Sequence, residues 1–462
     1  MRLGNRLALT TGKGLGFTSR LLNVGGGSTL PGRAARLLYP GFVPDMVKEL
    51  PLGSVLVTGT NGKTTTATLL AGILDRAGMT PVHNRTGANL MAGIASTLIR
   101  ESDLGGHLAG RIGLFEVDEA AFPAAVAETS PRLVLVNNLF RDQLDRYGEL
   151  DTLASSMKEA VQALDPASIV VLNADDPLVA SIGRDLPHKV LYYGINTDRY
   201  GSESMQHAAD SKHCTGCGSR LAYEYYLFGH MGRYKCPSCG ISRPESQVSA
   251  LELEMVELEG TRCRVGYPGG EVTIFIPLPG LYNVYNFLAA TACALALGVE
   301  LEVIIEGMEG FKAAFGRVER VEVEGRHALM ILAKNPAGFN EVIRTLTGGT
   351  GRKNVLLALN DNIADGRDVS WIWDVDFEMF RDRLGRVFCS GIRAADIALR
   401  VKYAELGEDS LTVEPDLARA LDMGLETVKP QETLYIVPTY TAMLDLRRVM
   451  VKRGLVAPYW EG

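Results

Sequence analysis

The sequence has no long hydrophobic run. No stretch in its 462 residues reaches the length of about 18 apolar residues that a transmembrane helix needs, so we expect none. The N-terminus also lacks the apolar core of a secretory signal peptide, because polar residues and glycine interrupt it between Thr10 and Gly14. The most apolar stretch, Leu288–Val299, is rich in alanine and predicts a buried helix.

Strong charge of one sign is absent from the chain as a whole. The formal net charge of −7 provides no general attraction for nucleic acid. The first fifty residues are locally basic, because they contain only two acidic residues, Asp45 and Glu49. Their basic residues are Arg2, Arg6, Lys13, Arg20, Arg33, Arg36 and Lys48. Because this segment is weakly periodic, we interpret it first as a solvated arm. The alternative is a surface that contacts anionic groups, such as lipid headgroups or polyphosphate.

The cysteines do not suit a disulfide framework. Their number, seven, is odd, and four of them form two Cys-x-x-Cys pairs, which indicates a reducing compartment and a metal. Cys214 and Cys217 are separated from Cys236 and Cys239 by eighteen residues, the spacing of a zinc ribbon. Four thiolates would make a closed, structural Zn²⁺ site. The other cysteines lie in apolar contexts and are expected in the core: Cys263, Cys293 and Cys389.

Apolar runs alternate with helical patterns along most of the chain. A strand over 54–58 precedes a Gly-rich turn and a helix from Lys63 to Ala77. Further strands are expected over 113–117, 133–137, 169–173, 190–193, 251–257, 262–266, 272–277, 328–332, 355–359, 386–389 and 433–437, with a long helix over 283–297. This alternation predicts an α/β, doubly wound fold.

The length favours two or three domains. We divide the chain into a basic N-terminal segment, 1–50, a central α/β domain, 51–315, and a C-terminal Rossmann-like α/β domain, 316–462. A polar, Tyr-rich and Cys-rich insertion occupies 202–247 of the middle domain, where the alternation of strands and helices stops.

A Gly-rich turn between the first strand and helix carries the signal for phosphate binding. Backbone N–H groups converge at such a turn, and the helix N-terminus adds positive potential. Lys63 would reach the terminal phosphates, and the Thr64 hydroxyl would hold Mg²⁺. The spacing departs from the Walker pattern, because Val57 stands in place of its first glycine; the alternative is a turn with a chance lysine. The candidate nucleotide-binding residues of the loop are Gly59, Thr60, Asn61, Gly62, Lys63, Thr64 and Thr65.

This segment resembles the phosphate loop of the Mur ligases and folylpolyglutamate synthetases, which implies a P-loop ATPase domain of the Mur ligase type. Glu116, at the end of the next strand, matches the Mg²⁺-binding glutamate of that superfamily. The alternative for Glu116 is a solvated acid at a strand end. Asp118 and Glu119 stand where many members have two serines.

Other superfamily segments are present with departures. The segment from Asn137 to Arg146 resembles one whose histidine binds a second metal, but Gln143 replaces that histidine. Lys158 lies where several Mur ligases carry a carbamylated lysine, and is equally compatible with a surface lysine of a helix. The aspartate that contacts ribose in relatives falls at Ile331, which cannot make that contact.

Two further candidates come from the same resemblance. The segment Gly280–Asn286 is similar to one that places an asparagine on adenine, which makes Asn286 a candidate. The alternative is that Asn283 caps the following helix. Arg317 resembles the arginine that the C-terminal domain supplies near the phosphates.

Over nearly its whole length the chain resembles the MurT subfamily, the ligase subunits of lipid II isoglutaminyl synthases. The resemblance rests on the phosphate loop, the four-cysteine insertion and segments 140–146, 332–338 and 359–371. It implies ATP-dependent amidation of the D-isoglutamate α-carboxyl of the lipid II stem peptide through an acyl phosphate. It also implies Mg²⁺, structural zinc, a GatD-type glutamine amidotransferase as partner in a heterodimer, and a cytoplasmic location at the inner face of the plasma membrane, with peripheral membrane contact.

The same resemblance gives Asp368 a role beside Lys63 and Glu116 in catalysis. It matches an aspartate thought to complete the partner's Cys–His pair, where a carboxylate would orient the imidazole. The alternative is a turn or cap residue, and the nearby aspartates compete for the assignment: Asp361, Asp365 and Asp374. Two other functions stay open, a single-chain amino-acid-adding ligase such as a folylpolyglutamate synthetase and a nucleotide-binding scaffold without activity.

Overall fold

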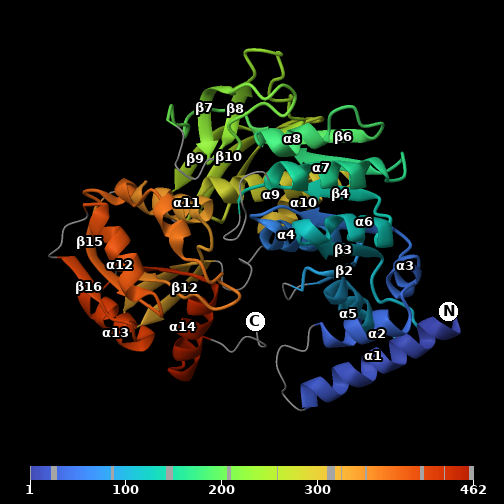
Figure 1. Cartoon of the computed structure of the whole chain (residues 1–462), viewed down its shortest axis with the longest axis horizontal. Helices are drawn as coiled ribbons and strands as arrows, with labels where there is room; N and C mark the ends of the chain where they lie inside the picture. The colour runs from blue at the N-terminus through green and yellow to red at the C-terminus, as the bar shows by residue number, and fades with distance from the viewer. Residues whose placement is uncertain are drawn as a thin grey trace.

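Two lobes lie side by side in the computed structural model (Figure 1). The larger lobe is built on a nine-stranded sheet and the smaller on a six-stranded sheet, and a two-stranded hairpin belongs to the larger lobe. The structure describes residues 2–21, 29–84, 88–141, 149–204, 210–256, 259–309, 318–323, 325–348, 351–405, 410–430 and 432–456.

The sheet of the larger lobe has the order β11-β10-β9-β6-β5-β4-β1-β3-β2. Neighbours from β2 to β9 are parallel, whereas β10 and β11 add an antiparallel meander. The strands are β1 (Ser54–Thr58), β2 (Pro81–His83), β3 (Ile112–Glu116), β4 (Leu133–Val136), β5 (Ile169–Asn173), β6 (Lys189–Ile195), β9 (Val248–Val256), β10 (Gly260–Tyr267) and β11 (Gly270–Ile276). Every residue of β1, β3 and β4 is buried, because helices cover both faces of the parallel part.

The two helical layers form separate hydrophobic cores with the sheet. One layer consists of α4 (Lys63–Arg76), α9 (Leu281–Ala296) and α10 (Leu301–Glu309). The other consists of α3 (Phe42–Val47), α5 (Met91–Glu101), η1 (Glu119–Ala121), α6 (Phe122–Thr129), α7 (Glu149–Gln162) and α8 (Pro177–Ile182). In β1 the side chains alternate between them, with Val55 and Val57 in the first core and Leu56 in the second.

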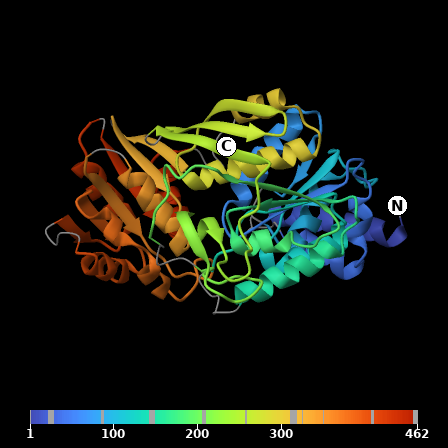
Figure 2. The same ribbon diagram turned by 90° about the horizontal axis from the view of Figure 1, so that it is seen from above.

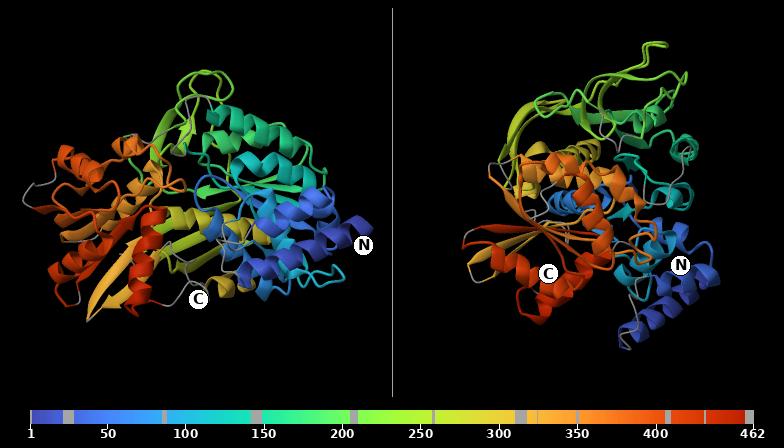
Figure 3. Two further views of the ribbon diagram at one scale, coloured as in Figure 1. Left: turned by 60° about the horizontal axis from the view of Figure 1, so that its bottom comes forward. Right: turned by 60° about the vertical axis from the view of Figure 1, so that its left-hand side comes forward.

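The expectation of a solvated N-terminal arm is wrong for the described residues. They form α1 (Leu3–Leu21) and α2 (Leu30–Leu38), which pack on each other and on α5. Ala8, Leu9 and Ala35 are fully buried. Figure 3 shows α1 along the outer surface of the larger lobe.

The described part of the insertion contains the antiparallel hairpin β7 (Ala222–Phe228) and β8 (Met231–Lys235). The hairpin lies near the junction of the two lobes (Figure 2), and Arg344 of the smaller lobe donates to the carbonyl oxygen of Leu227 in β7.

The smaller lobe has the strand order β12-β13-β17-β14-β15-β16, parallel except for the edge strand β12. Its strands are β12 (Val318–Val323), β13 (Arg326–Ile331), β14 (Lys353–Ala358), β15 (Leu384–Ser390), β16 (Leu411–Val413) and β17 (Thr433–Pro438). Its helices are α11 (Pro336–Thr347), η2 (Ser370–Asp374), η3 (Phe377–Phe380), α12 (Ala394–Tyr403), α13 (Leu417–Thr427) and α14 (Tyr440–Lys452).

All the strands expected from the sequence are present, with ends that shift by a few residues. The predicted boundary between residues 315 and 316 lies outside the described residues and stays a prediction. Of the helices in the described part, none combines the length and hydropathy needed to cross a membrane.

Candidate active site

The phosphate loop connects β1 to α4 and is held on both sides. The Asn61 N–H donates to Asn138 Oδ1 at 2.8 Å, and Asn138 Nδ2 donates to the Asn61 carbonyl at 3.1 Å. The Thr60 hydroxyl accepts from the Phe140 N–H at 3.0 Å. The segment that follows β4 therefore fixes the loop, and α4 begins directly after the loop at Lys63.

Two glycines of the loop have no room for a side chain. Gly59 and Gly62 have φ values of +127° and +84°, which favour glycine. A Cβ at Gly62 would lie 2.0 Å from Asn286 Oδ1, and one at Gly59 would lie 2.9 Å from the Asn138 nitrogen. Glycine is therefore required at both positions for the loop to keep this conformation against Asn286 and the segment after β4.

Thr64 and Glu116 meet where β3 ends. The Thr64 hydroxyl donates to Glu116 Oε1 at 3.0 Å. Asn84 fixes the strand end, accepting from the Glu116 N–H and donating to its carbonyl, both at 2.8 Å. Glu116 Oε2 is buried and has no hydrogen-bond partner among the described residues. Because a buried carboxylate oxygen without a partner is costly, and a hard cation would satisfy it, these residues fit Mg²⁺.

Lys63 is paired with Glu119, one turn beyond the strand end. Its Nζ lies 2.9 Å from Glu119 Oε2 and donates to the Gly59 carbonyl at 2.6 Å. Burial acts to raise the pKa of Glu119, but the charge and hydrogen bond of Lys63, with the charge of Lys334, lower it overall. Glu119 is therefore ionised at neutral pH. Asp118 instead caps η1, accepting from the Ala120 N–H at 3.1 Å.

A cavity beside the loop is lined by four parts of the chain. Gly62 and Thr65 line it from the loop and α4, and Tyr285 and Asn286 from α9. Further lining comes from the β7–β8 hairpin, with Phe228 and Met231, and from the smaller lobe, with Leu332, Lys334 and Asn335. An apolar cavity with amide groups, next to a phosphate loop, fits a nucleoside base.

Asn286 is positioned by neighbouring amides. Its Oδ1 accepts from the Thr66 hydroxyl at 3.2 Å, and its Nδ2 donates to Asn283 Oδ1, also at 3.2 Å. Asn283 donates to the Pro279 carbonyl at 2.8 Å. The alternative that Asn283 caps the helix is wrong, because α9 begins at Leu281 and Asn283 lies in its first turn.

The two lobes are joined next to the loop. Asn335 Nδ2 donates to Asn61 Oδ1 at 3.0 Å, while Asn335 Oδ1 accepts from the Gly338 N–H at 2.8 Å and caps α11. Near the C-terminal end of α11, Arg344 donates to the Tyr200 carbonyl at 2.7 Å. The N-terminus of α11 is therefore tied to the phosphate loop.

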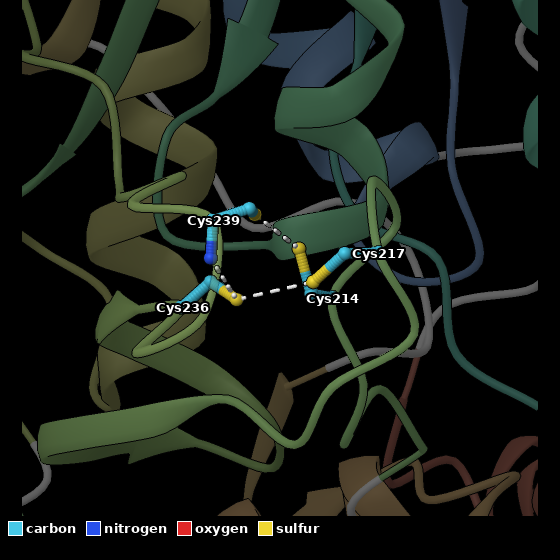
Figure 4. Close-up of side chains that lie close together, drawn as sticks. All are labelled: Cys214, Cys217, Cys236 and Cys239. Carbon is cyan, nitrogen blue, oxygen red and sulfur yellow. Dashed lines mark hydrogen bonds between the residues drawn. The ribbon is translucent and has the colours of Figure 1, made fainter.

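The four ribbon cysteines come together as their spacing predicts (Figure 4). Their sulfurs lie within 4.8 Å of one another, with Cys214–Cys239 and Cys217–Cys236 each at 3.5 Å. Tetrahedral zinc, at about 2.3 Å from each sulfur, would separate them by about 3.8 Å, so the cluster fits that ion. Hydrogen bonds from Ser219 lower the pKa of the Cys217 thiol to about 6, whereas for Cys239 the Ile241 backbone acts to lower the pKa but hydrogen bonds with the neighbouring thiols raise it to about 12. The geometry of the four sulfurs, rather than these opposite shifts, supports a metal. The other three cysteines are buried, as expected: Cys263, Cys293 and Cys389.

Buried polar groups link the ribbon to the cavity. Arg243, which follows the second cysteine pair, is paired with Asp175, and both side chains are almost fully buried. Asp175 Oδ2 also accepts from the hydroxyl of Tyr285, a cavity residue, at 2.7 Å. In the hairpin turn, His230 lies 3.4 Å from Asp176, and this contact together with Asp176's charge raises the pKa of His230 against the effect of burial.

The aspartates after β14 have different surroundings. Asp365 is buried and accepts from the Thr441 N–H at 2.8 Å, and Asp361 pairs with Arg393 at 2.8 Å. Asp368 is exposed, and its Oδ1 accepts from the Ser370 N–H at 2.8 Å. Hydrogen bonds from Ser370 lower the pKa of Asp368.

Some predicted residues lie away from this centre. Ile331 is a core residue at the end of β13, and Lys158 Nζ lies 3.5 Å from the Ser181 carbonyl, between α7 and α8. Arg317 and Gln143 lie outside the described residues.

Three groups that the structure brings to the site could not be assigned a role from the sequence. These are the Glu119 carboxylate on Lys63, the Asn84 amide that holds β3, and the hairpin wall of Phe228 and Met231. Only Glu119 had a signal, as a replacement for a serine of the superfamily.

Comparison with known proteins shows that the chain is similar to Mur ligases. The Mur ligase middle domain model matches residues 57–294, and the MurT ligase C-terminal model matches residues 332–443. The chain is 33% identical to the MurT subunit of lipid II isoglutaminyl synthase (glutamine-hydrolyzing) from Streptococcus pneumoniae, over 99% of both chains. It is 31% identical to the corresponding subunit from Staphylococcus aureus, over 91% of this chain and 92% of that one. A pseudomurein peptide ligase type C from Methanothermus fervidus shares the fold, with a TM-score of 0.68 and 24% identity over 89% of this chain and 81% of that one.

Proposed function

Because this chain belongs to the MurT family of Mur ligases, we propose that it amidates the lipid II stem peptide in an ATP-dependent reaction. The acceptor is the α-carboxyl of the D-isoglutamate residue, which becomes D-isoglutamine. The observation that carries the proposal is the Thr64–Glu116 pair at the mouth of a phosphate loop, in a chain with a MurT-type C-terminal segment.

The chemistry has two balanced steps. An oxygen of the acceptor carboxylate attacks the γ-phosphorus of ATP, and the bond to the bridging oxygen breaks, which releases ADP and leaves an acyl phosphate. The nitrogen of ammonia then attacks the carbonyl carbon, inorganic phosphate leaves with the bonding electrons, and a proton is lost to give the amide.

The residues of the loop stabilise charge in the first step. Backbone N–H groups at the start of α4 and the Lys63 ammonium face the phosphates, where the charge develops. Thr64 and Glu116 would hold Mg²⁺, which would supply further positive charge at the phosphate oxygens. Glu119 keeps Lys63 beside the loop before ATP arrives, and phosphate oxygens would compete with Glu119 for that ammonium.

We propose that ammonia comes from a GatD-type glutamine amidotransferase. The related subunits are named for a glutamine-hydrolysing synthase, which implies a partner subunit. Within this chain, burial raises the pKa of the thiols of Cys263 and Cys389 to about 12, so neither is a suitable glutaminase nucleophile. A lipid-linked acceptor and an ATP-dependent step place the work in the cytoplasm, at the inner face of the plasma membrane.

Asp368 is proposed to complete the catalytic triad of that partner. Asp365 and Asp361 are bound to Thr441 and Arg393 of other elements, whereas Asp368 is exposed and ionised, and it accepts its hydrogen bond from Ser370, two residues further along the same turn. A carboxylate on the distal imidazole nitrogen fixes the tautomer of a catalytic histidine.

The test uses the complex of this chain with its amidotransferase. ADP release is measured with lipid II and either glutamine or ammonium chloride, and the stem peptide is analysed by mass spectrometry. We expect Asp368→Asn to abolish most glutamine-driven turnover, since loss of the triad carboxylate lowers kcat by about 10⁴ in serine proteases. The same variant should keep ammonia-driven turnover, and the matched variant Asp374→Asn should keep both.

Each failure has a distinct meaning. If Asp368→Asn retains glutamine-driven turnover, the triad assignment is wrong while the ligase reaction stands. If lipid II gives no turnover with either nitrogen source, but a folate and an amino acid do, the chain is a single-chain ligase.

A further inference from the structure

We propose that the outer face of the N-terminal helices α1 and α2 binds the surface of an anionic phospholipid membrane. Membrane contact through these helices is independent of the proposed ligase reaction, although a lipid-linked acceptor would give such contact a purpose.

Each helix has one buried face and one exposed apolar face. In α1 the positions 5, 8, 9 and 12 are buried, whereas 3, 7, 10, 14 and 17 are exposed, which is the spacing of one helical face. In α2 the buried positions are 31, 32 and 35, and the exposed ones include 30, 33, 37 and 38. We call the large exposed apolar side chains the N-terminal apolar face: Leu3, Leu7, Phe17, Leu30, Leu37 and Leu38.

The packing explains why these side chains point outward. Both helices approach α5 through small residues, with Gly12 against Ile99 and with the Gly32 N–H donating to the Ser96 hydroxyl at 2.9 Å. A Cβ at Gly32 would lie 1.9 Å from the Ala92 carbonyl, so this side of α2 has no room for larger groups. Leu3 and Leu37 are left 86% and 85% exposed. Figure 1 shows α1 at the edge of the molecule, with α2 between it and α5.

Basic residues predominate around this face, although the charge of Asp45 acts on Arg2. The first 44 residues contain six basic residues and no acidic one. Arg2, Arg6 and Arg33 are exposed beside the apolar side chains. Other basic residues of the segment are directed inward, because Arg36 pairs with Glu128 at 2.6 Å and Lys13 donates to the Ser102 carbonyl.

Leucines and a phenylalanine flanked by arginines suit the boundary between lipid headgroups and acyl chains. The charge selects an anionic surface, since each Lys or Arg near such a surface contributes about fivefold to binding. A protein partner could also cover an apolar face, and the test separates the two.

The full-length chain, with zinc bound, is sedimented with vesicles of phosphatidylcholine alone or mixed with phosphatidylglycerol. We expect binding to the mixed vesicles that weakens as salt is added. The triple variant Leu3→Ser, Leu7→Ser, Leu37→Ser and the double variant Arg6→Gln, Arg33→Gln should each lower the partition coefficient by at least about tenfold.

The controls carry the same substitutions at exposed sites elsewhere. Leu399→Ser, on α12 of the smaller lobe, and Arg262→Gln, on β10, should bind as the unaltered chain does. Thermal unfolding of each variant checks that the fold is kept. Unchanged vesicle binding by the folded variants, or no binding of the unaltered chain to anionic vesicles, would overturn the proposal. Loss of amidotransferase binding without any vesicle effect would assign the face to the partner instead.

Discussion

Gly62 is the position where the structure gives the sharpest prediction about nucleotide binding. Replacing it by alanine keeps the charges and hydrogen-bond donors of the loop, and adds a single methyl group. An L-residue at its φ of +84° costs about 1–2 kcal/mol. The new Cβ would also lie 2.0 Å from Asn286 Oδ1.

Asn286 cannot move away without losing its own contacts. Its amide is bound to Thr66 and Asn283 at 3.2 Å each, inside the buried second turn of α9. Losing one such hydrogen bond costs about 1 kcal/mol. Strain and contact together give about 2–3 kcal/mol against the loop conformation that accepts phosphate, which corresponds to a loss of about 30- to 160-fold in ATP affinity.

Calorimetric titration with ATP and Mg²⁺ measures this loss. The matched control is Gly78→Ala, because Gly78 has a similar φ of +71° but no heavy atom within 4 Å of its Cβ position. We expect this control to lose about 1–2 kcal/mol of stability from the same strain and to keep its ATP affinity. Equal dissociation constants for the two variants would show that this loop does not receive the nucleotide.

Three further predictions concern the network, the zinc and the junction of the lobes. Arg243→Met leaves the buried Asp175 without its counter-ion and should lower the free energy of unfolding in urea by about 3–5 kcal/mol. Arg262→Met removes an exposed ion pair with Glu254 and should lower the free energy of unfolding by less than about 1 kcal/mol. Similar losses of stability in the two variants would show that burial does not make the Arg243–Asp175 pair more important. Removal of zinc by a chelator should lower the melting temperature, and added Zn²⁺ should restore it; an unchanged melting temperature rules out a structural ion. Asn335→Asp keeps a cap for α11 but loses the donor to Asn61, so the KM for ATP should rise about fivefold while the stability of the protein stays constant. Asn335→Ala loses the cap as well, so it should raise the KM and also lower the stability.

The central strands of both sheets could be predicted because most of them are parallel and covered by helices. Such strands appear as continuous apolar runs, as in Leu133–Val136, where all four residues are buried. The edge strands β2, β12 and β16 were missed, although Val318, Val321 and Val323 of β12 are β-branched residues typical of strands. In the sequence, Val318–Val323 was considered only as the continuation of the segment that begins before it at Arg317.

The N-terminal helices could not be predicted from local propensity. Gly4, Gly12, Gly14 and Gly16 lie within α1, and each lowers the intrinsic stability of a helix by about 1 kcal/mol. The structure shows what compensates for two of them: Gly12 lets α1 approach Ile99, and Gly4 lies against the ring of Tyr39. Tertiary packing of this kind leaves no periodic signal in the segment itself.

The residue that pairs with Lys63 also could not be predicted from the sequence. Asp118 and Glu119 both follow the strand end, and the chain alone does not tell which carboxylate turns toward the loop. The geometry of η1 decides, because Asp118 is used as its cap and Glu119 is left to reach the ammonium at 2.9 Å. A spacing can indicate which elements meet, but the side chain that completes a contact depends on the turn between them.

The four cysteines could be predicted as a zinc site, but their motif says nothing of how the insertion relates to the rest of the lobe. The hairpin between the two cysteine pairs supplies Phe228 and Met231 to the cavity beside the phosphate loop. Arg243, just after the second pair, reaches Tyr285 through Asp175. Because an ion bound by all four sulfurs would fix both ends of this hairpin, it would also fix one wall of that cavity. We therefore interpret the ribbon as a structural part of the nucleotide site.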